Sequence, residues 1–542
     1  MSYEITRDFI YIDLPKDIAD DLGAVWNQKA RRFRLPNTIG SLRDIYKVEK
    51  IRNGDTESII AYANEKVKQR ETLLKLKQAK DTKGDDRLRP YQRVDVNYLS
   101  RLPHAGIFNE MRTGKTPTSL SLVNTKDFNS IIIVCPAGLV LQWGDEVEKW
   151  TRGIESFIIT GSKAARSKQY EKYKTSKSKK AMIIGYEMLR NDISYIIQAL
   201  KVKEIDALIV DEAHRLRGLC NGRNASAQSK AVFTLGQIAK HRYALTGTPT
   251  VRAGYEIYGI LTFLYPDKFP GYWQFIDRYF EVKDGYFGKE IAECKRQDEL
   301  EEILTLISTN RKRSEVMEWL PDKTYQTVRL KLEGKQKRAY EDVETMFEYE
   351  EDGELKVDAP SVLAQLTRLR QITTSPSMLE INAPSVKEKF IMEWLKDNPD
   401  ESVLILSSFS SYLIRLQKKI KGSAMITGSV TKPKRKQIEK DFQAGKAKVL
   451  LANTKAVQEG LTLDKAETVI FLDKMFNPSE NQQAEDRIVP VSKERNHAMM
   501  VITLVCKDTY DEAIEFALKN KLNITKIIND AGLNGLKRLI KE

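Results

Sequence analysis

The chain has 542 residues, with 89 Lys or Arg against 75 Asp or Glu, and its formal net charge is +14. A chain of this length is expected to form several domains, and the basic excess favours a polyanionic partner. It has four cysteines and four histidines, and no two cysteines form a Cys-x-x-Cys pair. This composition argues against a zinc ribbon, an iron–sulfur cluster and a disulfide framework.

No stretch of the chain approaches the roughly 20 apolar residues that a membrane-spanning helix needs. The first residues, Met-Ser-Tyr-Glu-Ile, lack the basic and then apolar pattern of a signal peptide. We therefore expect a cytoplasmic protein of a reducing compartment, with no membrane partner.

Residues 1–55 are expected to form a small α+β domain. Apolar and aromatic residues at 9–12 and 32–36 predict strands, and the pattern at 17–22 predicts a short helix. Residues 56–86 follow as a helical linker that ends in a polar connection.

Aromatic and basic side chains alternate within this first domain. Trp26 and Phe33 lie among Lys29, Arg32 and Arg34, a combination suited to stacking on an exposed base and holding phosphates. The same aromatic residues can equally form the core of a small domain, which needs every large apolar group it has. Both interpretations stand on the sequence alone.

Residues 87–265 alternate strand and helix patterns, which predicts an α/β domain with helices on both faces of a parallel sheet. The segment 161–180 is rich in Ser, Lys and Tyr, and we expect it to be an exposed basic loop. Strands are expected at 131–135, 181–185, 207–210 and 243–246.

The segment 109–116, Asn-Glu-Met-Arg-Thr-Gly-Lys-Thr, predicts a phosphate-binding loop. A glycine at the bend lets backbone N–H groups approach an anion, the lysine supplies a positive charge, and the last threonine can hold Mg²⁺. Asn109 stands where the strict pattern has its first glycine. The predicted ATP-binding residues of this loop are Met111, Arg112, Thr113, Gly114, Lys115 and Thr116.

Asp211 and Glu212 follow the apolar run 207–210, so two carboxylates are expected at the tip of a buried strand. There Asp211 can hold Mg²⁺, and Glu212 can orient or deprotonate an attacking water. A solvated helix start is the alternative for so short a motif. Together with the phosphate loop, the pair makes nucleotide hydrolysis the leading interpretation.

A second α/β series occupies 401–508, after a mostly helical region at 266–400 and before a C-terminal helical segment at 509–542. In the helical region, Val362, Leu363, Leu366, Leu369 and Ile372 keep the spacing of a buried stripe. Strands of the second series are expected at 402–406, 423–426, 449–452, 468–472 and 499–504.

Arg487 follows the strand expected at 468–472, within the run Gln-Ala-Glu-Asp-Arg at 483–487. In a protein with two such lobes, a positive charge of the second lobe can act as an arginine finger on a nucleotide bound by the first. Binding and loss of the γ-phosphate can then drive closing and opening of the lobes.

The ordered motifs from about 87 to 517 resemble those of superfamily 2 DNA translocases of the Swi/Snf type, especially compact phage and bacterial members. The resemblance implies two RecA-like lobes with helical insertions between them, and the segment 22–36 is similar to the HARP-type modules of fork-remodelling translocases. It rests on Leu-Arg-Pro-Tyr-Gln at 88–92, the phosphate loop, Asp-Glu-Ala-His at 211–214, Leu-Thr-Gly-Thr-Pro at 245–249 and the run at 483–487.

The resemblance also implies roles for individual residues. Arg89, Gln92 and Gly460 are expected to help bind ATP, with Gln92 reading the adenine. The catalytic set becomes Lys115, Asp211, Glu212, Gln483 and Arg487, with Thr116 and Asp211 as the Mg²⁺ ligands.

DNA is expected to be tracked along its phosphate backbone, mostly without base contacts. The residues implied are Pro136, Ala137, Gly138, Gln142, Trp143, Tyr186, Thr246, Gly247, Thr248, Ser408, Thr427, Gly428 and Thr454, with Trp26, Arg32 and Phe33 of the first domain.

One position departs from the family's pattern in a way that bears on hydrolysis. The last motif usually carries two arginines three residues apart, and Pro490 stands at the second place after Arg487. A proline side chain cannot contact phosphate, so Arg487 must act alone, or Lys493 or Arg495 must substitute.

We therefore expect a monomeric ATP- and Mg²⁺-dependent DNA translocase that remodels branched or forked DNA by fork regression, branch migration or annealing. One alternative is a motor that displaces proteins from duplex DNA without a preference for branches. The other is a nucleotide-gated DNA-binding module with weak hydrolysis, which Pro490 favours.

Overall fold

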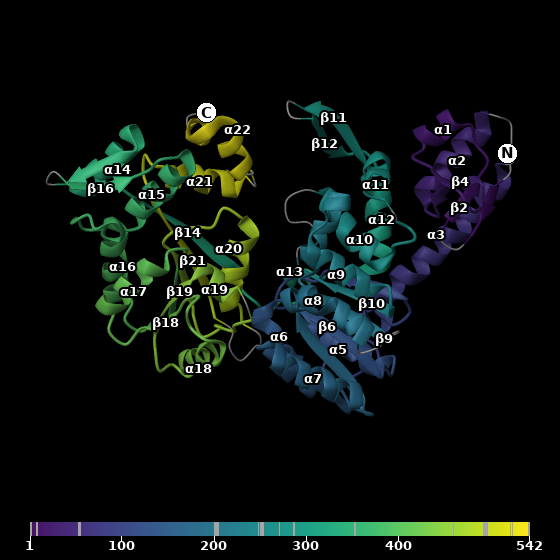
Figure 1. Ribbon diagram of the computed structural model, residues 1–542, viewed down its shortest axis with the longest axis horizontal. Helices are drawn as coiled ribbons and strands as arrows, with labels where there is room; N and C mark the ends of the chain where they lie inside the picture. Colours follow the sequence, from purple (N-terminus) through teal and green to yellow (C-terminus); the bar gives the residue numbers. More distant parts are fainter. Residues whose placement is uncertain are drawn as a thin grey trace. The chain divides into compact units, whose positions relative to one another are not determined.

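The computed structural model (Figure 1) describes residues 3–6, 9–51, 56–199, 205–247, 249, 254–269, 271–285, 288–351, 354–458, 460–490, 497–520, 522 and 524–539. The chain forms two compact units, Met1–Val316 and Met317–Glu542. Their boundary falls inside the region 266–400, which is less uniformly helical than expected. It contributes β13 (Ser308–Thr309) to the first parallel sheet and β14 (Lys323–Leu330) to the second.

A four-stranded antiparallel sheet in the order β1-β2-β4-β3 forms the N-terminal domain. The two strands expected there are confirmed as β2 (Phe9–Ile12) and β4 (Arg32–Pro36). Ile10, Ile12 and Leu35 point to one face and are buried, as the two-residue period of a strand requires. The other elements are β1 (Tyr3–Ile5), α1 (Lys16–Asp21), β3 (Val25–Asn27) and α2 (Ile39–Ile51).

A buried ion pair fixes this domain to the first lobe. Arg278 of α11 (Tyr272–Tyr279) and Glu299 of α12 (Gln297–Ile307) lie 2.8 Å apart, and each side chain is only 4% exposed. Arg278 also donates to the Leu22 carbonyl oxygen at 2.6 Å and to Ser41 Oγ at 2.8 Å. The domain is therefore held by charged hydrogen bonds, and removal of either partner would leave the other charge buried with only a longer ion pair, Arg278 to Asp44 at 3.9 Å or Glu299 to Arg296 at 3.7 Å.

The first lobe has a parallel sheet of seven strands in the order β13-β5-β10-β9-β6-β8-β7. Alternate strand residues enter separate cores: Ile132 packs on the side of α8, α9 and α10, and Ile133 on the side of α4, α5 and α6. The strands are β5 (His104–Ile107), β6 (Ser130–Cys135), β7 (Ile154–Ile159), β8 (Lys179–Gly185), β9 (Ile205–Asp211) and β10 (Ala239–Leu245). The helices are α4 (Pro90–Leu99), α5 (Lys115–Thr125), α6 (Val140–Trp150), α8 (Tyr186–Ser194), α9 (Ala227–Gly236), α10 (Tyr258–Leu264) and α13 (Arg313–Val316).

The expectation of a loop at 161–180 is wrong, because α7 (Lys163–Thr175) occupies most of it. Tyr170 and Tyr173 are buried on one side of this helix, and the Tyr173 ring meets the Phe157 ring of β7 at 5.5 Å. Ser162 caps the helix by accepting from the Ala165 N–H. The sequence did not predict this helix because its apolar side consists of few residues among many lysines.

The second unit has a parallel sheet of six strands in the order β14-β21-β20-β17-β19-β18, shown in green and yellow in Figure 1. Its five remaining strands fall where the sequence predicted them. They are β17 (Val403–Ser407), β18 (Ala424–Ile426), β19 (Val449–Asn453), β20 (Thr468–Phe471) and β21 (Met499–Cys506). The covering helices are α16 (Val386–Asp397), α17 (Ser410–Lys419), α18 (Lys432–Gln443), α19 (Thr454–Val457) and α20 (Pro478–Glu485).

A separate helical core adjoins this sheet, made by α14 (Gly334–Met346), α15 (Val362–Thr374), α21 (Tyr510–Lys519) and α22 (Ile524–Arg538). Leu366, Leu369 and Ile372 of the predicted stripe are buried there, whereas Val362 and Leu363 are 40% and 62% exposed, so the stripe is narrower than expected. Two hairpins complete the chain: β11 (Phe280–Gly285) with β12 (Gly288–Cys294), and β15 (Glu348–Glu351) with β16 (Glu354–Asp358). Over the described ranges, no helix combines the length and the apolar character that a membrane span requires.

The helix α3 (Glu57–Gln78) joins the N-terminal domain to the first lobe and is fixed at its last turn. The Lys77 ammonium donates to the Thr305 carbonyl oxygen at 2.7 Å and lies 5.0 Å from the centre of the Tyr98 ring. Burial lowers the pKa of Lys77 from 10.5 to about 8, against the opposing effect of Asp95.

We expect the contribution of Lys77 to stability to rise with pH between about 8 and 10.5, since the unfolded chain then holds a proton that folded Lys77 has lost. The slope is at most about 1.4 kcal/mol per pH unit. Lys77→Met keeps the apolar stem, so it should raise the melting temperature at pH 7 and flatten this rise. Lys75→Met, in the same turn but exposed, is the control. Thermal denaturation at several pH values is the measurement. If the melting temperature of Lys77→Met depends on pH as it does in the parent, the assignment is contradicted.

Candidate functional site

The phosphate loop lies between β5 and α5, and glycine is required at its bend. Gly114 has φ of 81°, and a Cβ atom there would lie 2.1 Å from Gln92 Nε2. The Thr113 carbonyl oxygen accepts from Gln92 Nε2 at 2.9 Å and from the Tyr91 hydroxyl at 2.8 Å. The Arg89 N–H donates to Gln92 Oε1 at 2.8 Å. In this structure, the predicted adenine reader therefore links α4 to the loop.

Asn109, the departure from the strict motif, is a buried structural link. Its Nδ2 donates to Asp95 Oδ2 at 2.9 Å, and its Oδ1 accepts from the Arg311 N–H at 3.0 Å. Arg311 Nη2 lies 2.7 Å from Asp95 Oδ1. The loop is thus tied to α4 and to the segment after β13, two partners that a local motif cannot reveal.

The ends of β5 and β10 bring Lys115 next to Gly247. Lys115 Nζ donates to the backbone oxygens of Asn109 and Glu110 at 2.9 and 3.2 Å. A Cβ atom at Gly247 would lie 3.5 Å from Lys115 Nζ and 3.3 Å from Met111 Cγ. Gly247 was predicted to contact DNA, and the structure places it against the phosphate loop.

The Asp211 carboxylate lies at the end of β9 in a partly buried position. Burial raises its pKa from 3.8 to about 6, the Glu212 charge adds to this effect, and Trp143 and Lys115 oppose it. Trp143 Nε1 donates to Asp211 Oδ2 at 2.9 Å, and the Glu212 N–H donates to Oδ1 at 2.9 Å. Glu212 has φ of 51°, a left-handed conformation that turns the chain sharply at the strand end.

A polar chain connects Glu212 to the end of β10. His214 Nδ1 lies 3.1 Å from Glu212 Oε2 and 3.4 Å from the Thr246 hydroxyl. Thr246 was predicted to grip DNA, but it is completely buried. In this structure its hydroxyl therefore takes part in an internal link between the carboxylate and the loop after β10. Thr248 lies outside the described residues.

Trp143 and Tyr186 were also predicted to contact DNA, and in this structure both side chains are buried. Trp143 supports the Asp211 carboxylate, and the Tyr186 hydroxyl donates to the Asp211 carbonyl oxygen at 2.6 Å. They belong to the helices that follow β6 and β8. The carboxyl ends of parallel strands lie at one edge of the sheet. The location of both residues shortly after a strand could therefore have predicted that they lie near Asp211.

The other predicted DNA contacts differ in exposure. Ser408 is partly exposed. Arg32 forms ion pairs with Asp13 at 3.1 Å and with Glu4 at 3.4 Å, both within the N-terminal domain. Trp26 is 51% exposed and meets the half-buried Phe33 ring at 5.0 Å. Ala137, Gln142 and Gly428 are exposed, Gly138 is partly exposed, and Pro136, Thr427 and Thr454 are buried and so present no side chain to DNA.

In the second unit, Arg487 lies beside the loop that carries Gly460. Its guanidinium donates to the Gln458 carbonyl oxygen, and its own carbonyl oxygen accepts from the Leu463 N–H at 2.9 Å. Gln483 lies on α20, one turn before Arg487. Pro490 is buried, and Lys493 and Arg495, the suggested substitutes, lie outside the described residues.

The donors at the phosphate loop fit a Mg²⁺ ion bound together with a nucleotide. Within the described part of the chain, no cluster of three or more His, Cys, Asp or Glu could hold a metal ion by itself. Mg²⁺ prefers one or two protein oxygens supplemented by phosphate and water oxygens. The Thr116 hydroxyl and the Asp211 carboxylate are the oxygens that would hold such an ion.

A phosphate loop and a carboxylate pair on one parallel sheet, followed along the chain by a second parallel sheet, define a P-loop NTPase of the helicase class. A family model for the SNF2-related domain matches residues 91–378, and one for the helicase conserved C-terminal domain matches residues 386–490. The chain belongs to the SNF2-related family.

Curated relatives are similar over most of this chain. Chromodomain-helicase-DNA-binding protein 1-like of Danio rerio is 28% identical over 83% of this chain and 44% of its own length. DNA annealing helicase and endonuclease ZRANB3 of Homo sapiens is 26% identical over 84% of this chain and 42% of its own. The chain thus spans less than half of these relatives. The Sulfolobus solfataricus SWI2/SNF2 ATPase core in complex with dsDNA shows 21% identity and a TM-score of 0.38, covering 84% of this chain and 96% of that one.

We expect Trp143→Phe to raise the pKa of Asp211 above its value of about 6, because the variant loses a hydrogen bond that favours the charged carboxylate. Binding of Mg²⁺ with a non-hydrolysable ATP analogue should then weaken at a higher pH than in the parent, by about tenfold per pH unit below the pKa. Titration calorimetry from pH 5 to 8 measures this shift.

Trp150→Phe changes another tryptophan of α6, whose ring lies 5.0 Å from the Arg87 guanidinium, and serves as the control. Its Mg²⁺ binding should follow the parent at every pH. If the Trp143→Phe curve also superimposes on the parent, the hydrogen bond does not tune Asp211.

Proposed function

We propose that this chain is a DNA-dependent ATPase that uses ATP hydrolysis to move along the phosphate backbone of DNA. The observation that carries the proposal is the convergence of Lys115, Asp211, Glu212 and Gly247 on one edge of the first parallel sheet. Membership of the SNF2-related family and the excess of 89 basic over 75 acidic residues support it.

The residues of the first lobe have distinct proposed roles. Lys115 holds the β- and γ-phosphates, and Thr116 and Asp211 hold Mg²⁺, which neutralises charge on the phosphates. Glu212 orients the attacking water, and His214 keeps that carboxylate in place at 3.1 Å. Because His214 also meets Thr246, occupancy of the site can be passed to the loop after β10.

Arg487 is proposed to stabilise charge in the transition state as an arginine finger. Its hydrogen bond to the Gln458 carbonyl oxygen places it beside Gly460 within the second unit. A buried Pro490 at the place of the second arginine favours a second candidate, a nucleotide-gated DNA-binding module with slow hydrolysis. The turnover number at saturating DNA decides between the two.

The DNA contacts are proposed to follow the phosphate backbone. Ala137 and Gly428 are exposed shortly after β6 and β18, Gln142 is exposed on α6, and Ser408 is partly exposed. Backbone contacts of this kind carry little sequence information and weaken steeply with salt. Duplex binding should therefore depend on ionic strength far more than on sequence.

Branched DNA is the finer part of the proposal. Trp26 is half exposed on a domain that the Arg278–Glu299 pair fixes to the first lobe, so the aromatic ring has a set position relative to that lobe. A fixed aromatic ring can stack on a base that is unpaired at a fork. ZRANB3, a relative of this chain, is named a DNA annealing helicase, which is consistent with such a substrate.

Lys115→Ala should abolish DNA-stimulated ATP hydrolysis, since the phosphate loop loses its positive charge. The loss should be at least about 100-fold in kcat, as expected for removal of a group that stabilises developing charge. Phosphate release with and without duplex DNA is the measurement.

Lys163→Ala, which changes an exposed lysine at the first position of α7, is the control and should retain parental turnover. Parental turnover in Lys115→Ala would remove the catalytic assignment. A parent protein with no DNA-stimulated hydrolysis would refute the proposed function itself.

Trp26→Ala should lower ATPase stimulation by forked and four-way-junction DNA about 5-fold or more, because stacking on one base contributes about 1–3 kcal/mol. Stimulation by linear duplex should change less than about 2-fold on the same scale. Trp273→Ala removes another tryptophan of the same unit, 55% exposed, and is the matched control. Equal losses on linear and forked DNA would argue against a role in branch recognition.

A further inference from the structure

A second buried carboxylate organises the strand ends of the second unit. Asp473 follows β20, and its side chain is only 4% exposed. It accepts hydrogen bonds from the Ser407 hydroxyl, the Ser408 hydroxyl and the Ser408 N–H, the last at 3.1 Å. The Phe409 N–H donates in turn to Ser407 Oγ at 3.1 Å. One carboxylate thus fixes the loop 407–409, which carries a proposed DNA contact.

Arg370 of α15 is the cation paired with this carboxylate, and the charge of Lys387 also acts on it. Its Nη2 lies 3.1 Å from Asp473 Oδ1 and donates to the Lys474 carbonyl oxygen at 2.8 Å. The guanidinium carbon lies 4.7 Å from the centre of the Phe476 ring and 5.5 Å from that of the Phe409 ring. Contacts with two rings and two oxygens leave the guanidinium little freedom. Arg370 therefore contacts both the loop after β17 and the segment that leads into α20.

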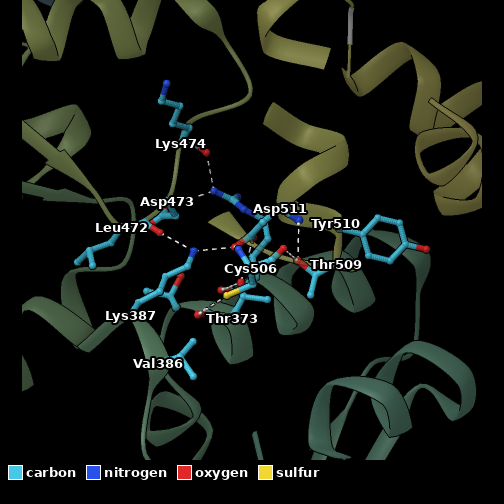
Figure 2. Close-up of polar contacts among 12 residues, drawn as sticks. Thr373, Val386, Lys387, Leu472, Asp473, Lys474, Cys506, Thr509, Tyr510 and Asp511 are labelled. Carbon is cyan, nitrogen blue, oxygen red and sulfur yellow. Dashed lines mark hydrogen bonds and ion pairs between the residues drawn. The ribbon is translucent and has the colours of Figure 1, made fainter. Parts of the chain in front are cut away.

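A second buried ion pair, Lys387 with Asp511, links the neighbouring helices α15, α16 and α21 (Figure 2). The Lys387 ammonium donates to the Leu472 carbonyl oxygen at 2.7 Å and lies 2.6 Å from Asp511 Oδ2. The Thr373 hydroxyl, three residues along α15 from Arg370, donates to Asp511 Oδ1 at 3.0 Å. These contacts anchor α15 and α16 to α21 without touching the loop 407–409, so α15 carries two separable functions.

We infer that Arg370 is a positioning residue that neutralises Asp473 and so allows the loop 407–409 to approach a DNA phosphate. The inference rests on the proposed function, because the DNA contact of Ser408 is part of that proposal. A bare carboxylate beside a phosphate would repel it, and desolvation strengthens that repulsion. The positive charge of Arg370 offsets the negative charge of Asp473 at short range. Its contacts with Lys474 and Phe476 also hold the segment before α20 next to the same loop.

The test compares Arg370→Gln with the double variant Arg370→Gln/Asp473→Asn. Arg370→Gln should raise the duplex dissociation constant, measured by fluorescence anisotropy without nucleotide, about tenfold or more, because one partner of a buried pair is left charged. The DNA concentration for half-maximal ATPase stimulation should rise equally, and ATP hydrolysis without DNA should be unchanged. The double variant should recover most of the lost affinity, since the unpaired carboxylate is gone.

Thr373→Val is the matched control, because it removes a buried hydrogen bond of the same helix and should leave DNA affinity at the parental value. Recovery of DNA affinity in the double variant would show that the effect of Arg370→Gln comes from the unpaired charge. If lost packing were the cause, a second substitution would not restore the affinity. If Arg370→Gln does not fold, Asp473→Asn alone decides: the inference requires DNA affinity within about threefold of the parent.

Parental DNA affinity in a folded Arg370→Gln protein would overturn the inference while leaving the proposed function intact. So would a double variant as weak as the single one. A parent protein that neither binds DNA nor responds to it in ATP hydrolysis would overturn the proposed function and the inference together.

Discussion

Asp211 ends a buried strand where its charged form is disfavoured, and the candidate nucleotide site depends on how that effect is offset. Its supports are the Trp143 N–H on one carboxylate oxygen, the Glu212 N–H on the other, and the charge of Lys115. The carboxylate therefore keeps lone pairs for a metal ion. The sharp turn at Glu212 and the His214–Thr246 contact extend this arrangement to the neighbouring strand end.

The second unit contains a carboxylate at the end of a strand in a different setting. Asp473 accepts from two serines and is paired with Arg370, so its charge is neutralised and its lone pairs are used within the protein. The comparison shows how parallel sheets of one architecture serve different purposes. Buried strands bring polar groups to the same edge, and the partners from the surrounding helices decide whether a carboxylate is available or structural.

The N-terminal domain follows the same principle of charge burial. The Arg278–Glu299 pair is nearly inaccessible, and Arg278 also bonds to the backbone and a serine of that domain. Such a pair adds little net stability over an apolar contact, but it disfavours any arrangement that leaves one charge unpaired. The half-exposed Trp26 is consequently presented from a defined position, whereas Arg32 is engaged with Asp13 and Glu4.

The sequence by itself determined the two α/β lobes, most strands of their sheets and the chemistry of the phosphate loop and carboxylate pair. Those features depend on local patterns: the apolar runs of buried strands, a glycine at a required bend, and residue types with fixed chemistry. Only the tertiary structure decided that Asn109 bonds to Asp95 and Arg311, the latter 202 residues away in sequence. It also decided that Trp143 and Tyr186 face Asp211 from inside the lobe. These roles depend on partners that folding brings together from distant parts of the chain, so no local pattern could contain them.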